Sequence, residues 1–107
     1  MIDEQAFRKH AEQAIEQLQR ALEKAMDRYE FEVDSNQGAL TIEFEDPPAR
    51  FVVSPNAPVR QIWVSARVKS FKLDWDEARS AFVLGGKDLK ELIAGVIGEQ
   101  LEEEVTL

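Results

Sequence analysis

The spacing of apolar residues constrains the fold of this chain most, because it follows one period at both ends and another in the middle. Residues 3–27 contain neither Gly nor Pro. Their apolar side chains recur at steps of three and four residues, which places them on one face of a helix. These residues are Phe7, Ala11, Ala14, Ile15, Leu18, Leu22, Ala25 and Met26. With Asp3 as an N-cap and Glu4 near the positive end of the helix dipole, we predict a long helix from Asp3 to about Asp27.

The middle of the chain alternates between apolar and polar residues, a pattern typical of half-buried strands. We predict a first strand over residues 29–34 and a second over residues 40–45, with a turn at Ser35–Gly38. Asp46-Pro47-Pro48 should end the second strand, because proline lacks a donor for the ladder. Four further strands are expected over residues 50–53, 60–66, 67–75 and 79–84, with a loop at residues 54–58 and Gly85-Gly86 after the last strand.

A second helix is predicted near the end of the chain. Asp88 is a suitable N-cap, and Glu91, three residues on, can complete a capping box. The apolar stripe of this helix consists of Leu89, Leu92, Ile93, Val96, Ile97 and Leu101. Gly95 and Gly98 lower its helix propensity, and we expect them to let the helix pack close to the sheet. Glu102–Glu104 should form a solvated tail.

The order of the predicted elements is helix, strands, helix, and the short connections imply antiparallel pairing. Each helix has one apolar stripe and the strands offer one apolar face, so the simplest arrangement places both helices on the same face of one sheet. We therefore predict an α+β fold, a two-layer sandwich of two helices on one face of a mainly antiparallel sheet of about five to six strands. The chain of 107 residues fits a single domain, covering residues 1–107.

Trp63 is the residue that points most directly to function. In a strand, Ile62 and Val64 would face the core. Gln61, Trp63 and Ser65 would then face the open side of the sheet, among polar neighbours. An indole in this position is either covered by a loop or by long charged side chains, or it anchors a partner, a role in which Trp is favoured. The sequence leaves both explanations open.

Charge and cysteine content exclude several classes of function. The formal net charge is −8, from 21 acids and 13 bases. Nucleic acid and membranes are therefore not expected as partners, because phosphate surfaces attract basic proteins. The sequence has no cysteine, which excludes disulfides, thiol nucleophiles and Cys-ligated zinc or iron–sulfur sites. The polar, acidic N-terminus is no signal peptide and no apolar run reaches membrane-spanning length, so we expect a cytoplasmic protein.

Four short motifs resemble those of the frataxin family, including its bacterial members, and they lie in the family's order on matching elements. They are Gly38-x-Leu40-Thr41-Ile42, Pro58-x-x-Gln61-Ile62-Trp63-Val64-Ser65, Asp74-Trp75 and Asp88-Leu89-x-Glu91-Leu92-Ile93. The resemblance covers nearly the whole chain. It implies the same α+β sandwich that the periodicity predicts.

The chain departs from the family pattern close to both functional regions of the family. Ser54 and Asn56 stand where the family usually has Asn and Gln, ahead of the Gln-Ile-Trp segment. The dense acidic ridge of the family is interrupted here by Arg20, Lys24 and Arg28. These differences bear on tight iron binding more than on the fold.

The resemblance implies an iron-binding accessory protein that regulates iron–sulfur cluster assembly. Members of the family bind iron weakly through surface carboxylates and dock on the cysteine desulfurase and the scaffold protein of cluster assembly. Carried over to this sequence, the iron ligands are Glu23, Asp27, Glu30, Glu32 and Asp34. The docking residues are Trp63, Gln61, Ser65 and Asn56. We expect a monomer in the absence of iron.

The acidic residues themselves leave two functions open. Glu30, Glu32 and Asp34 would share the outward face of one strand. Glu23 and Asp27 would share one face of a helix. Such carboxylates suit hydrated Fe²⁺ or Fe³⁺ without enclosing it, yet any one of them taken alone is better explained as a solvated surface charge. The alternative function is therefore a protein-interaction module of the same fold without physiological iron binding.

No arrangement typical of an enzyme is evident. His10 is the only histidine, and the sequence shows no Ser-His-Asp set. Gly85-Gly86 lacks the pattern of a phosphate-binding loop or a dinucleotide fingerprint. Ferroxidase activity has been discussed for the family, but a dedicated di-iron site needs Glu-x-x-His pairs, and the sequence offers none. We therefore expect a protein that is not an enzyme.

Overall fold

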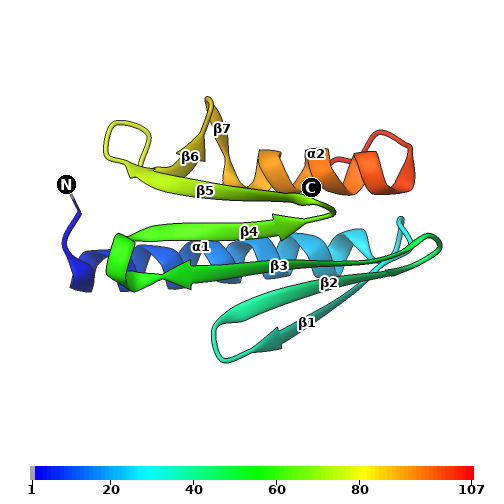
Figure 1. Ribbon diagram of the computed structural model, residues 1–107, viewed down its shortest axis with the longest axis horizontal. Coiled ribbons are helices and arrows are strands. Elements are labelled where there is room, and N and C mark those ends of the chain that lie inside the picture. The colour runs from blue at the N-terminus through cyan, green and yellow to red at the C-terminus, as the bar shows by residue number, and fades with distance from the viewer. Residues whose placement is uncertain (1) are drawn as a thin grey trace.

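Two helices lie against one face of an antiparallel sheet in the computed structural model, which describes residues 2–107 (Figure 1). The sheet contains seven strands within these residues, ordered as in the sequence from β1 to β7. The elements are α1 (Glu4–Ala25), β1 (Glu32–Asn36), β2 (Ala39–Glu45), β3 (Pro48–Asn56), the 3₁₀ helix η1 (Ala57–Val59), β4 (Gln61–Ala66), β5 (Lys69–Asp76), β6 (Ala81–Leu84), β7 (Lys87–Asp88) and α2 (Leu89–Leu101). The predicted α+β sandwich is confirmed, with more strands than expected.

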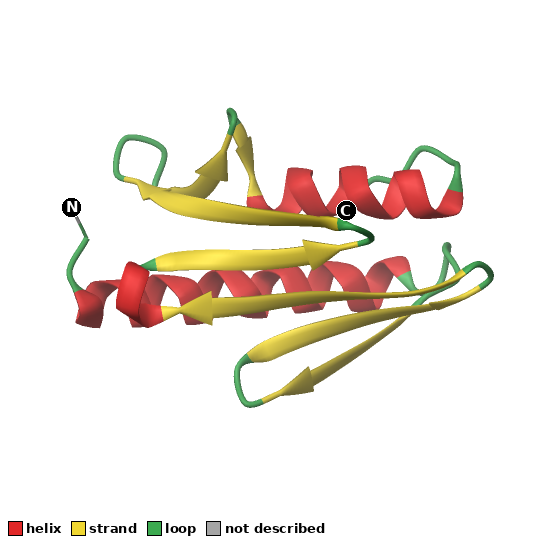
Figure 2. Ribbon diagram, viewed as in Figure 1, coloured by secondary structure: helices red, strands yellow, loops and turns green. Residues whose placement is uncertain are grey.

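The additional strand is β7, which pairs with β6 after a turn at Gly85-Gly86. Both glycines have positive φ angles, of 57° and 82°, and this conformation suits a tight hairpin turn. A strand of two residues is too short to show alternation, which explains why the sequence pattern does not reveal it. Figure 2 shows how β7 leads directly into α2.

Both helices begin where their capping residues predict. The Asp3 carboxylate accepts the Ala6 N–H at 2.8 Å, and Asp88 and Glu91 form a complete capping box. The end of α1 differs from the prediction, since the helix stops at Ala25 and not near Asp27. Residues 26–28 form a turn that reverses the chain before Phe31, which is 6% exposed, enters the core.

Two strand boundaries also differ from the prediction. β1 covers residues 32–36 and not residues 29–34, so the turn to β2 consists only of Gln37 and Gly38, both with positive φ. β3 extends to Asn56, through the segment predicted as a loop. β2 pairs with β3 only as far as Val53, so beyond that point β3 has a neighbour on one side. Pro55 therefore lies on a free edge, where a missing N–H is tolerated.

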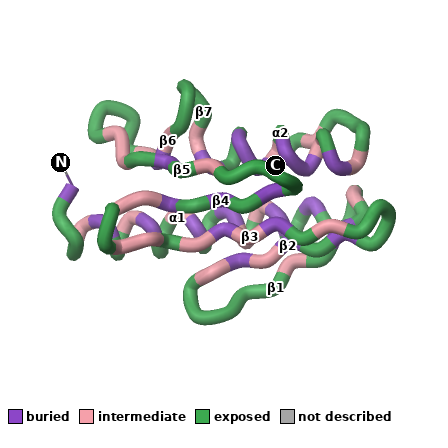
Figure 3. Tube along the Cα trace, viewed as in Figure 1, coloured by how far each residue is buried: buried purple, intermediate pink, exposed green. Residues whose placement is uncertain are grey.

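The core lies between the helices and the inner face of the sheet, as the purple segments in Figure 3 show. α1 contributes its predicted stripe apart from Met26, which follows the helix and is 39% exposed, and Phe7, Leu18 and Leu22 are almost completely buried. The inner face of the sheet contributes Leu40, Ile42, Phe51, Val53, Ile62, Val64, Leu73 and Phe82. The opposite face has no helix on it (Figure 1). Within residues 2–107 no helix is both long and apolar enough to span a membrane.

The last residues return to the ends of both helices. Glu102–Glu104 are exposed, as predicted, but Val105 and Leu107 pack against the core. The Arg28 guanidinium donates to the Thr106 carbonyl at 3.1 Å, and the Thr106 N–H donates to the Tyr29 hydroxyl at 3.3 Å. The C-terminal segment is therefore fixed to the turn after α1.

Gly98 permits this return of the chain. A Cβ atom at Gly98 would lie 2.9 Å from the Glu103 carbonyl oxygen, and the Glu103 N–H donates to the Gly98 carbonyl at 3.2 Å. A Cβ atom at Gly95 would meet nothing within 4 Å. The expectation that both glycines bring α2 close to the sheet is therefore wrong, because Gly98 admits the C-terminal segment and Gly95 faces open space.

The two glycines of α2 make a matched pair for a stability measurement. Gly95→Ala should raise the free energy of unfolding by about 0.5–1 kcal/mol, because alanine has the higher helix propensity. Gly98→Ala offers the same gain in propensity but forces the Glu103 carbonyl away, so we expect no gain or a loss. Urea unfolding monitored by circular dichroism measures both, and equal stabilisation by the two variants would contradict this role of Gly98.

Candidate functional site

The four residues predicted to dock a partner lie together on the open face of the sheet. Gln61, Trp63 and Ser65 alternate along β4 with buried residues. Asn56, at the end of β3, is opposite Gln61 in the strand register. Trp63 is 38% exposed, although it lies in the middle of a central strand. The orientation predicted from alternation is therefore confirmed.

Neighbouring side chains hold the Trp63 indole in one orientation. Its N–H donates to Gln61 Oε1 at 2.9 Å, and Gln61 Nε2 donates to Asp74 Oδ1 at 3.0 Å. Lys72 lies opposite Trp63 on β5 and places its ammonium nitrogen 4.9 Å from a ring centroid of the indole, within the range of a cation–π contact. Lys72 covers some of the ring, as the first explanation predicts, while 38% of the residue remains exposed.

Lys72 and Asp74 are absent from the docking residues predicted from the sequence. They become neighbours of Trp63 and Gln61 only through the register of β4 against β5. That register depends on the connecting turn at Arg67-Val68, in which Arg67 has a φ angle of 59°. The alternation of polar residues in β5 is the one sequence signal that could have placed them on the open face.

A shallow hollow adjoins the indole on the open face. Its lining includes Val52, Ser54, Ser65, Ser70 and Lys72. Short side chains therefore stand next to the ring, and a partner's side chain could pack against the indole there. An aromatic residue bordered by serines and by the apolar side chains of Val52 and Phe71 has the composition of an interface anchor.

The acidic residues predicted to bind iron are all exposed but come from different elements. Glu23 lies on α1, whereas Asp27 lies in the turn after it. Glu30 precedes β1, and only Glu32 and Asp34 lie on that strand. Two expected groupings are therefore wrong: Glu23 and Asp27 do not share a helix face, and Glu30 is not on the strand face with Glu32 and Asp34.

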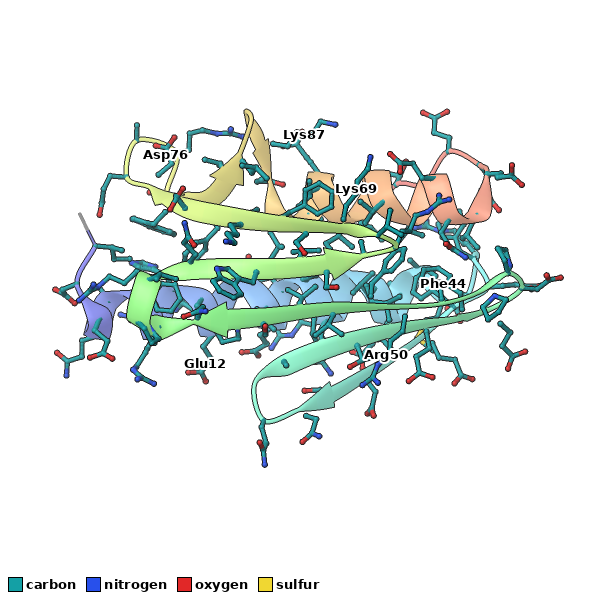
Figure 4. All side chains as sticks on the ribbon, viewed as in Figure 1. Glu12, Phe44, Arg50, Lys69, Asp76 and Lys87 are labelled. Carbon is teal, nitrogen blue, oxygen red and sulfur yellow. The ribbon has the colours of Figure 1, made fainter. Side chains whose placement is uncertain are left out.

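Three further acids join this region from β2 and the turn after it. Glu43 is opposite Glu32 in the register. Together with Glu30, Glu32 and aromatic side chains, the acids Glu43, Glu45 and Asp46 line one hollow at this end of the sheet. Alternation along β2 could have placed Glu43 and Glu45 on the open face, but their position beside Glu32 depends on the two-residue turn between the strands. Arg50, labelled in Figure 4, is the register partner of Glu43 on its other side.

These carboxylates suit weak rather than enclosed coordination of a cation. No three His, Cys, Asp or Glu side chains within residues 2–107 converge on a point where they could hold a metal ion together. A hard cation bound here would take one or two carboxylate oxygens and keep water as its other ligands. Two of the interrupting bases are engaged nearby, because Arg20 pairs with Glu16 at 2.6 Å and Arg28 binds the Thr106 carbonyl.

The fold and the site together define a class of protein, the α+β sandwiches with a helix at each end of the chain. The uncovered face of the sheet presents an ordered tryptophan, and one end of the sheet is acidic. A family model described as a frataxin-like domain matches residues 1–103. The chain belongs to the frataxin family.

Similar proteins agree with this assignment. The chain is 34% identical over 95 residues to the "Iron-sulfur cluster assembly protein CyaY" of Azotobacter vinelandii, covering 85% of this chain and 86% of that protein. It is 29% identical over 108 residues to the protein of the same name from Cupriavidus metallidurans, covering 99% and 96%. A solved structure of frataxin from Psychromonas ingrahamii has the same fold, with a TM-score of 0.71 at 20% identity and coverage of 97% and 96%.

The hydrogen-bond chain from Asp74 through Gln61 to Trp63 gives a testable expectation. Gln61→Ala removes the acceptor of the indole N–H, so this proton should exchange with water faster than in the parent protein. Because the site is exposed, the free energy of unfolding should fall by no more than about 1 kcal/mol. Solvent exchange of the indole N–H, measured by NMR, tests the contact. An unchanged exchange rate would show that Gln61 does not hold the indole in solution.

Proposed function

We propose that this protein is an accessory protein of iron–sulfur cluster assembly that docks on the assembly machinery through the open face around Trp63. The observation that carries the proposal is an indole that is exposed on a central strand and yet fixed by Gln61 and Lys72. A side chain that is already ordered loses little entropy on binding, which favours it as an anchor. Curated relatives bear the name iron–sulfur cluster assembly protein, and this supports the pathway.

The partners we propose are the cysteine desulfurase and the scaffold protein of cluster assembly. A net charge of −8 favours association with a basic surface and raises the rate of encounter. The acids at the β1–β2 end of the sheet and the indole on β4 lie on one continuous face. A partner with a basic patch beside an apolar pocket would contact both. We assign no catalytic step to this chain, and we propose that it regulates the partner.

Iron enters the proposal as a weakly held cargo. Glu32 and Asp34 share one strand face, with Glu30 before the strand and Glu23 and Asp27 near the end of α1. Their exposure supports exchange of iron with water or with a partner rather than storage. The second candidate function is a protein-interaction module without physiological iron binding, and it is favoured by the absence of a converging ligand set within residues 2–107.

Replacement of Trp63 tests the docking face. Trp63→Ala should weaken binding to the desulfurase–scaffold complex by more than about 1 kcal/mol, while the free energy of unfolding changes little. Val68→Ala is a suitable control, because Val68 is fully exposed at the tip of the β4–β5 hairpin and away from the indole. Isothermal titration calorimetry measures both variants. Unchanged affinity in Trp63→Ala would exclude the open face as the docking surface.

Anaerobic titration with Fe²⁺, followed by amide NMR, separates the two candidate functions. If the protein binds iron, the amide signals from Glu23 to Asp34 should broaden selectively. Replacing the carboxylates of Glu23, Asp27, Glu30 and Glu32 by amides should abolish this broadening. The control neutralises Glu99, Glu102, Glu103 and Glu104, which changes the net charge equally and leaves the predicted iron ligands intact. If millimolar iron broadens none of these signals, the protein is an interaction module without iron binding.

A further inference from the structure

The outer edge of β1 is a free strand edge. β1 is the first strand of the sheet order and pairs only with β2. In Figure 1 it forms the margin of the sheet. Exposed edges can pair with another polypeptide, and proteins commonly protect them. The edge of β1 is therefore a possible site for pairing with another strand.

The backbone groups of Val33 and Ser35 point outward from this edge. The Ser35 N–H is bound by the neighbouring Asp34 carboxylate, with its oxygen 3.0 Å away, and so does not donate to β2. Outward and inward residues alternate in an antiparallel strand. Val33 therefore also directs its N–H and carbonyl outward, whereas Glu32, Asp34 and Asn36 bond to β2. Asp34 acts as a local cap on the outer edge.

A groove lies at the turn end of this edge, where Ser35 is the β1 residue that lines it and Pro55 and Ala57 line it from β3 and η1. The β1–β2 hairpin diverges from α1 towards its turn, as Figures 1 and 2 show. The groove left between them encloses about 550 Å³. Its α1 side includes the apolar residues Phe7, Ala11 and Ile15, and its opposite side includes Ser35 and Gly38. Phe7, Ala11 and Ile15 are each 6% exposed or less, so Ser35 and Gly38 border a groove with a nearly closed apolar floor.

The charges around the groove and the edge are acidic. Glu32 and Asp34 face the open side of β1, and Glu12 lines the groove and extends from α1 towards the side of the hairpin (Figure 4). None of these three carboxylates forms an ion pair with another described residue. Arg8 and Glu16, which also line the groove, are each paired within α1. The unpaired charge at this surface is therefore negative.

We propose that the β1 edge binds an extended segment of a partner protein as an additional strand, in which apolar residues alternate with Lys or Arg. Side chains of an added strand alternate between the two faces of the sheet. A side chain aligned with Ser35 would face the groove beside α1, and one aligned with Val33 would pack beside that partly buried side chain. Those aligned with Glu32 and Asp34 would lie beside carboxylates, where opposite charges pair favourably across strands.

The same charges disfavour a second copy of this chain as the occupant. Pairing β1 with β1 would bring Glu32 and Asp34 of one molecule beside acidic residues of the other, and like charges across strands are destabilising. A basic side chain attracted to Asp34 would instead release the Ser35 N–H for the incoming strand. This surface is distinct from the face around Trp63, and it shares Glu32 and Asp34 with the proposed iron ligands.

A pair of synthetic peptides tests the proposal in metal-free buffer, so that its outcome does not depend on iron binding or on Trp63. One blocked peptide alternates Lys and Val, and the other has the same composition with all lysines before all valines. The alternating peptide should shift amide signals of β1 and of the groove side of α1, and should slow hydrogen exchange at Val33 and Ser35. The block peptide should bind at least about tenfold more weakly. Equal binding of the two peptides, or shifts centred on Trp63, would overturn strand addition.

Substitutions at the edge provide the matched controls. Ser35→Pro removes the outward N–H without removing a hydrogen bond to β2. It should weaken binding of the alternating peptide at least about tenfold. The Ser35→Ala variant should bind the peptide with the affinity of the parent protein. If Ser35→Pro does not fold, the double variant Glu32→Lys and Asp34→Lys replaces it. This variant should bind an alternating Glu–Val peptide more tightly than the alternating Lys–Val peptide. An unchanged preference, or self-association through β1 in sedimentation, would refute the assignment of a basic partner strand.

Discussion

Burial of one face of the sheet beneath α1 and α2 determines where the other features of this protein lie. Because side chains alternate along a strand, burial of Ile62 and Val64 places Trp63 in solvent. The helices cover the inner face and enclose one continuous apolar core. The surfaces left accessible are the uncovered face, the sheet edges and the grooves beside α1.

The features of the fold that the sequence predicts correctly are those that depend on the local spacing of apolar residues. The stripe of α1, the caps at Asp3 and Asp88 and the alternation in β2 and β4 agree with the structure. The errors lie where chain reversal or pairing decides the boundary. Asp27 continues the helical pattern but falls in the turn that brings Phe31 into the core. Pro55 reads as a loop residue, yet it is tolerated in β3 because β2 no longer pairs at that position.

The same distinction separates what was predictable in the candidate site. Alternation alone places Gln61, Trp63 and Ser65 on the open face. The contacts that fix the indole require the register with β5, and that register depends on the backbone of the Arg67-Val68 turn. The prediction of which acids lie together is incomplete for the same reason. Glu43 lies opposite Glu32 only because of the short turn between β1 and β2. Properties of single elements can thus be predicted from the sequence, whereas neighbours across elements follow from turns.

Charge is distributed unevenly along the sheet, and this asymmetry has a consequence for recognition. Acids gather on β1 and β2, whereas Arg67, Lys69 and Lys72 belong to the β4–β5 hairpin. The indole lies between charges of both signs, with Lys72 over its ring and Asp74 bonded to Gln61. A basic partner would be attracted first to the β1 end, and contact with Trp63 would follow in one orientation. Like charges on β1 disfavour pairing of its free edge with another copy and favour a basic partner in the proposed orientation.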